Sequence, residues 1–182
     1  MYSVISARLA SLFAIPAAFM LVAAHPVPPK NLRGKENAAC RANETGPALR
    51  VTVNGLKDRA GQLRIELYPA NENDFLAADK DLIAAGKVFK RVDVAVPASG
   101  TPTLCIRAPQ PGTYAVAVLH DRDRNGKFGI WGDGIGAPGR ERLGRQRPDV
   151  SRATVSIGGG IVSRAVTMQY LRGFGFAPVD NT

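Results

Sequence analysis

Hydrophobic and polar residues alternate with a period of two in several short stretches after residue 48. Successive side chains of a β-strand point to opposite faces, so this period predicts strands with one buried face. Stretches with this pattern, bounded mostly by Gly, Pro or Asn, cover residues 49–53, 63–67, 88–96, 104–106, 153–157 and 161–171. Residues 113–119 (TYAVAVL) are apolar at both parities, which predicts a central strand covered on both faces.

These strands are expected to form one all-β domain over residues 48–172. Strand and helix patterns do not alternate along the chain, which argues against a doubly wound sheet. About seven short strands separated by frequent turns favour an antiparallel β-sandwich. Residues 71–85 are interpreted as a long connection anchored by Phe75 and Leu76, although they could hold a short helix, and residues 173–182 as a C-terminal tail.

The first 24 residues are expected to be a secretory signal peptide. After Arg8 the segment carries no charge, and it ends in the small residues Ala23 and Ala24. The apolar run is shorter than the roughly 20 residues that a helix needs to span a bilayer, so a permanent membrane anchor is the less favoured alternative. The mature chain is therefore expected to be periplasmic or secreted, without a transmembrane segment. Residues 25–47, rich in Pro and polar residues, are interpreted as a flexible linker.

Composition narrows the possible functions. The chain has 182 residues, enough for one domain with a real core, and its 45% apolar content excludes a wholly disordered protein. Two cysteines are too few for a Cys-rich zinc module. In an oxidising compartment Cys40 and Cys105 are expected to form a disulfide, the alternatives being a lipidated Cys40 or two free thiols.

Residues 121–126 resemble the first half of a calcium loop. Asp121, Asp123 and Asn125 place side-chain oxygens at alternate positions before Gly126, as hard cations require. The second half differs, because Gly132 stands where a bidentate Glu is expected and Asp133 follows one residue later. Calcium bound by Asp121, Asp123, Asn125 and Asp133 is thus one interpretation, and a loop closed by Asx turns is the other.

Three blocks of sequence carry a family resemblance: GQLRIELY at 61–68 followed by Phe75-Leu76, PGTYAVAV at 111–118, and HDRDRNGK at 120–127 followed by GIGAP at 134–138. Together they resemble the DUF2141 family of exported bacterial proteins over residues 48–172. The resemblance implies an envelope or secreted β-sandwich and no particular reaction. The 111–114 turn is also similar to that of transthyretin-like sandwiches, so an Ig-like or transthyretin-like architecture is expected by analogy. The chain departs from the family at Gly129 and in its basic stretch 140–144.

Positive charge is concentrated after the possible calcium loop. The whole chain carries a net charge of +9, and one segment holds five of its arginines, namely Arg140, Arg142, Arg145, Arg147 and Arg152. Such a loop can dock lipid headgroups, lipopolysaccharide phosphates or an acidic protein, whereas export argues against a nucleic acid. A merely solvated loop is the alternative. Phe128 and Trp131 beside it are expected to be buried anchors.

An enzymatic function has little support. His120 could serve as a general base, but the adjacent Asp121 should point to the opposite face of the strand. The sequence therefore predicts an exported, non-enzymatic envelope protein that binds a partner or an anionic ligand through residues 120–152. A calcium-stabilised module and a hydrolase using His120 are the alternatives.

Overall fold

Alternation of apolar and polar residues produces the strands that the sequence predicts. In β1 (Ala48–Asn54) the side chains of Leu49, Val51 and Val53 are fully buried, whereas Arg50 between them is exposed. The computed structural model describes residues 25–139, 143–144 and 147–179. The predicted signal peptide, residues 1–24, lies outside this range.

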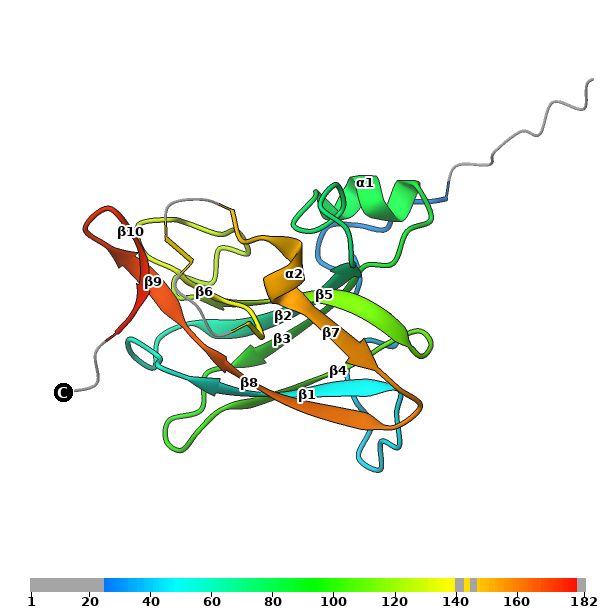
Figure 1. Ribbon diagram of the computed structural model, residues 1–182, viewed down its shortest axis with the longest axis horizontal. Coiled ribbons are helices and arrows are strands. Elements are labelled where there is room, and N and C mark those ends of the chain that lie inside the picture. Colours follow the sequence, from blue (N-terminus) through cyan, green and yellow to red (C-terminus); the bar gives the residue numbers. More distant parts are fainter. Residues whose placement is uncertain (1–24, 140–142, 145–146, 180–182) are drawn as a thin grey trace, which may run out of the picture.

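Ten strands and two short helices form the described part of the chain (Figure 1). After β1 come β2 (Gln62–Pro69), α1 (Asp79–Ala84), β3 (Lys90–Ala95), β4 (Thr103–Arg107), β5 (Gly112–Asp121), β6 (Gly134–Gly136), α2 (Val150–Ala153), β7 (Thr154–Ile157), β8 (Ile161–Thr167), β9 (Gln169–Arg172) and β10 (Gly175–Pro178). The predicted all-β class is confirmed.

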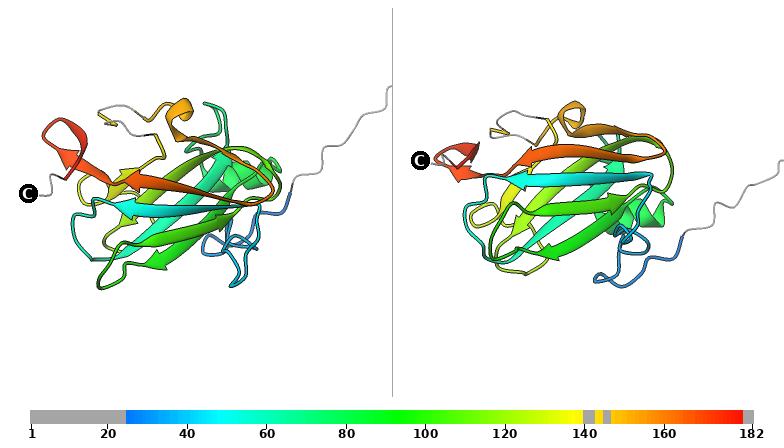
Figure 2. Two further views of the ribbon diagram at one scale, coloured as in Figure 1. Left: turned by 60° about the horizontal axis from the view of Figure 1, so that its bottom comes forward. Right: turned by 90° about the horizontal axis from the view of Figure 1, so that it is seen from below.

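The strands form two layers: Figure 1 shows β1, β4 and β8 below β2, β3 and β5, and the right view of Figure 2 looks onto the smaller sheet. The smaller sheet has the order β4-β1-β8, and the larger has β10-β9-β6-β5-β2-β3, with β7 also paired to β5. Between them lies the main core, to which β1 and β2 contribute Leu49, Val51, Leu63, Ile65 and Leu67. Burying these side chains provides the main favourable free energy of folding.

Three features differ from the sequence prediction. The β1–β8 pair is parallel, although the other pairs are antiparallel. Residues 161–171 form two strands in different sheets, because the chain crosses from one layer to the other at the buried Met168. The segment 120–152 is not one loop, since β6 pairs with β5 and β9 and α2 precedes β7.

Described residues of the segments interpreted as linker (25–47) and tail (173–182) pair with the rest of the domain. Ala38 is fully buried, its carbonyl accepts a hydrogen bond from the Arg107 amide at 2.8 Å, and the Sγ atoms of Cys40 and Cys105 are joined at 2.02 Å. At the other terminus β10 pairs with β9. Main-chain pairing and a cross-link thus hold stretches whose composition alone indicates loops.

A third layer covers the outer face of the larger sheet. Residues 70–89, including α1, pack there around Phe75, whose side chain is fully buried, and its ring meets that of Tyr68 edge to face at 5.7 Å. Residues 71–85 are therefore more than a connection, because they contain the short helix α1, the alternative that the sequence leaves open. This layer and residues 120–152 enclose the polar side chains of β2.

Candidate functional site

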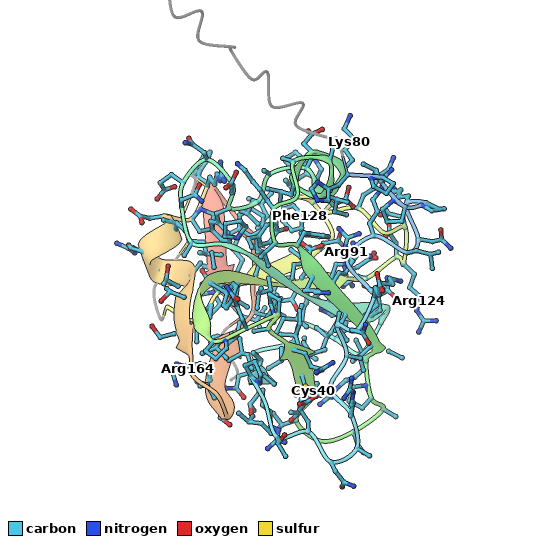
Figure 3. All side chains as sticks on the ribbon, turned by 90° about the vertical axis from the view of Figure 1, so that its right-hand side faces the viewer. Cys40, Lys80, Arg91, Arg124, Phe128 and Arg164 are labelled. Carbon is cyan, nitrogen blue, oxygen red and sulfur yellow. A yellow bond between two sulfur atoms is a disulfide. The ribbon has the colours of Figure 1, made fainter. Side chains whose placement is uncertain are left out.

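A pocket of about 450 Å³ lies between the outer face of the larger sheet and the segments that cover it. Its apolar walls are formed by Leu76, Leu119, Phe128, Ile135, Leu143 and Phe176. Its polar lining is formed by Arg64, Glu66, Tyr68, Arg91 and Arg147. Figure 3 shows Arg91 and Phe128 in the same region of the molecule, although they come from β3 and from the loop after β5.

Strand register brings opposite charges together in the floor of the pocket. The β2–β3 pairing places Arg64 opposite Asp93 and Glu66 opposite Arg91. Arg64 Nε donates to Asp93 Oδ1 at 2.7 Å, and Arg91 Nε donates to Glu66 Oε1 at 2.7 Å. Close ion pairs are what permit charged groups to remain buried.

Further contacts extend this network beyond the two strands. Arg91 Nη1 donates to Asp79 Oδ2 at 3.1 Å, and Arg33 donates to the other oxygen of the same carboxylate at 3.0 Å. Lys35 lies 2.8 Å from Asp93. Arg33 and Lys35 of the N-terminal segment thus stabilise the ion pairs in the floor of the pocket.

The network favours the ionised form of Asp93 and Asp79, whose pKa values are both lowered. Burial works to raise the pKa of Asp93, but Lys35 and Arg64 outweigh it and hold that pKa below its usual value. Burial, followed by the charge of Glu66, raises the pKa of Tyr68 well above its usual value, so its hydroxyl stays protonated and donates to Glu66. The floor therefore has fixed donors and acceptors at neutral pH.

Two donor groups in the floor have no acceptor among the described residues. Arg64 uses Nε for Asp93 and Nη1 for the Gly126 carbonyl, and Arg91 uses Nε and Nη1 for Glu66 and Asp79. Within residues 25–139, 143–144 and 147–179, nothing accepts from either Nη2. Guanidinium N–H groups bind carboxylates and phosphates strongly, so the floor can bind an anion.

Sequence reasoning missed this floor. A signal was present, because Arg64 and Glu66 in one strand are complementary to Asp93 and Arg91 in the strand that follows. Reading the charges in antiparallel register, rather than assigning them to a solvated face, would have found it.

The predicted arginine loop is only partly placed. Arg140, Arg142 and Arg145 lie outside the described residues. Arg147 lines the pocket, donates to the Glu72 carbonyl at 3.2 Å and lies 5.9 Å from the centre of the Phe75 ring. Arg152 is exposed on α2 and is not among the residues that line the pocket.

Three of the four predicted calcium ligands come together. One carboxylate oxygen each from Asp121, Asp123 and Asp133 lies within 4.8 Å of the others. Each carboxylate also accepts main-chain hydrogen bonds, Asp121 from the Gly126 amide at 3.0 Å and Asp133 from the Gly129 amide at 2.7 Å. The Asn125 side chain lies beside this cluster, with Nδ2 donating to Asp123 Oδ2 at 2.6 Å and Oδ1 accepting from the Lys127 amide at 2.7 Å.

His120 links two other segments of the chain through its ring nitrogens. Its side chain is fully buried, Nδ1 lies 2.7 Å from the Tyr170 hydroxyl, and Nε2 lies 2.7 Å from the Ala60 carbonyl. Burial lowers the pKa of His120 and raises the pKa of Tyr170 to about 12. Both ring nitrogens of His120 thus have partners within the described chain.

The two aromatic residues of the 122–133 loop differ in burial. Phe128 packs against Phe176 with 5.8 Å between ring centres but is still 38% exposed, and Trp131 is 84% exposed. The prediction that both are buried anchors is therefore wrong for Trp131, and Phe128 is only partly covered. The loop is held instead by the buried carboxylates of Asp121 and Asp133.

The fold and the pocket define an all-β sandwich whose outer sheet face carries a small, partly charged cavity. The chain belongs to the family described as "Uncharacterized protein conserved in bacteria (DUF2141)", whose model matches residues 51–164. No curated protein and no solved structure matches the chain. In the described part of the chain, no helix has the length and apolar character needed to cross a membrane.

Proposed function

We propose that this chain is an exported, non-enzymatic protein of the cell envelope that binds an anionic ligand or partner in the pocket beside residues 120–152. The observation that carries the proposal is the pocket floor, where Arg64 and Arg91 line a cavity with mostly apolar walls and each has an Nη2 group without an acceptor among the described residues. Pockets with mostly apolar walls and a few convergent polar groups are typical ligand sites. The Cys40–Cys105 bond supports export.

The ligand chemistry follows from the lining. Phe128, Phe176 and Ile135 suit an apolar body, and the guanidinium groups suit a carboxylate or phosphate head. Arg147 at the margin adds a third cation from the arginine segment. The site therefore fits an amphipathic anion better than a neutral lipid or a fully polar ion.

Isothermal calorimetry with decanoate and decanol tests this proposal. Decanoate is expected to bind saturably and more tightly than decanol, because only the carboxylate can accept from the guanidinium groups. Arg147→Gln should weaken decanoate binding about two- to fivefold, as expected for a partly exposed charge. Leu143→Trp should abolish it by filling the pocket.

The matched control is Arg164→Gln, which removes the same charge from an exposed position on β8 in the smaller sheet. It should bind decanoate like the parent chain. Equal affinity for decanol and decanoate, or no decanoate binding at all, contradicts the proposal.

Calcium binding at the carboxylate cluster is a separate prediction. If Asp121, Asp123 and Asp133 bind Ca²⁺ with the affinity of extracellular modules, millimolar calcium should stabilise the fold by about 1 kcal/mol relative to chelator. Thermal melting measures this difference. Asp123→Asn, at an exposed position, should remove it, and equal melting temperatures in calcium and chelator would show that the carboxylates serve only as Asx caps.

A further inference from the structure

Two loop tips expose aromatic side chains to an unusual degree. Trp131 is 84% exposed and Phe174 is 82% exposed, while Leu32 and Ile130, the next among the described residues, are 54% and 49% exposed. Neither Trp131 nor Phe174 lines the pocket. Clustered exposed apolar groups on a soluble domain mark a surface that meets a partner or a membrane.

The two tips lie at the same end of the molecule. Strands β6 and β9 are antiparallel neighbours with Gly134 opposite Tyr170, so the residues before β6 run beside those after β9. The Phe128–Phe176 contact joins the 122–133 loop to the β9–β10 hairpin. Figure 1 shows both at the left, away from the N-terminal segment and α1, and the views in Figure 2 agree.

Both tips are held rigidly by hydrogen bonds and strand pairing. Gly132 and Asp133 donate main-chain hydrogen bonds to the Gly129 carbonyl at 3.2 and 2.9 Å, which closes the turn that carries Trp131. Phe174 occupies the turn of a two-stranded hairpin in which Gly175 pairs with Arg172. Little backbone entropy is therefore lost when these side chains enter a new environment.

The exposed charges on the same two segments are mainly positive. Arg124, Lys127 and Arg172 are exposed, and Asp123 is the exposed carboxylate beside them. In Figure 3 the side chain of Arg124 extends from the margin of the molecule. Aromatic side chains favour the interfacial region of bilayers, and nearby cations are attracted to anionic lipid headgroups.

We infer that the tips formed by Ile130, Trp131 and Phe174 dock on an anionic lipid surface, with Lys127 and Arg172 over the headgroups. This inference goes beyond the pocket proposal and uses different side chains. The apolar side chains insert into the bilayer, and the cations cause the preference for negatively charged lipids. A partner with a polar surface would leave two large aromatic side chains without an apolar environment.

Trp131 is the one tryptophan in the sequence, so its fluorescence reports directly on docking. Phosphatidylglycerol vesicles are expected to shift its emission to the blue and to co-sediment with the protein, whereas phosphatidylcholine vesicles should do neither. Phe174→Ser should lower the partition coefficient about tenfold through lost apolar burial. Lys127→Gln should lower it about fivefold.

The matched control is Leu32→Ser, an exposed apolar position in the N-terminal segment, which should partition like the parent chain. Phe174→Ser should keep its decanoate affinity, and Leu143→Trp should keep its vesicle binding, so failure of this inference is distinguishable from failure of the pocket proposal. Equal binding to both vesicle types, or none, overturns the inference. So does an emission shift that appears without lipid as protein concentration rises, since that indicates a second copy.

Discussion

Replacing Cys40 and Cys105 together by alanine should lower the free energy of unfolding by about 4 kcal/mol. The two residues are 65 positions apart, and closing a loop of that length removes a large part of the conformational entropy of the unfolded chain. For a domain of this size the corresponding drop in melting temperature is roughly 8–16 °C. Urea unfolding of the double variant and the parent chain measures the difference.

The control for this prediction is reductant. Dithiothreitol should destabilise the parent chain by the same amount and leave the double variant unchanged, because only the parent has a bond to reduce. A parent chain whose unfolding midpoint does not respond to dithiothreitol would contradict it. Limited proteolysis adds a local readout, since the segment around Ala38 should be cleaved faster once the cross-link is lost.

Periodicity predicts the inner faces of the strands well, and β1 shows why. Its alternate residues Leu49, Val51 and Val53 meet a core that is apolar throughout, so burial follows from side-chain direction alone. The same rule fails for the outer face of β2. Arg64 and Glu66 resemble a solvated face, yet they are 7% and 3% exposed because segments distant in sequence cover them.

The alternating pattern also does not indicate which strands pair with one another. Val166, Met168 and Tyr170 keep one parity and are all buried, so the pattern runs unbroken through the point where the chain changes sheets. Strand β6 carries almost no pattern, since its sequence is Gly-Ile-Gly. Its glycines are required by close packing, because a Cβ on Gly134 would lie 2.5 Å from the Tyr170 ring.

The two candidate sites, the carboxylate cluster and the pocket, also differ in how far the sequence predicts them. Local spacing predicts that Asp121 and Asp123 lie close together, because one turn of chain is enough to bring them there, and the pairing of β6 with β5 returns Asp133 to the same place. The pocket needs side chains from β2, β3, the loop after β5, and β10. Such a set depends on tertiary contacts, and only the complementary charges of β2 and β3 indicate part of it in advance.

Substituting Arg91 by methionine should cost about 3–5 kcal/mol of stability. The Arg91 side chain is 11% exposed and neutralises Glu66, whose side chain is 4% exposed and has Tyr68 as its other hydrogen-bond partner. Removing one member of a buried ion pair leaves the other charge without compensation, which is more costly than losing the pair. Arg164→Met, an exposed substitution of the same kind, should change stability by no more than about 0.5 kcal/mol.

A double variant separates the structural role of Arg91 from its role in binding. Arg91→Met combined with Glu66→Leu leaves no unpaired charge at this pair, and Asp79 keeps Arg33, so the double variant should recover part of the lost stability in urea unfolding, less the cost of the Tyr68 hydroxyl that loses its acceptor. It also lacks one of the two guanidinium groups in the pocket floor, so decanoate affinity should stay low although the fold is restored. Recovery of binding together with stability would show that Arg91 only supports the sheet, and that the anion-binding donors lie elsewhere.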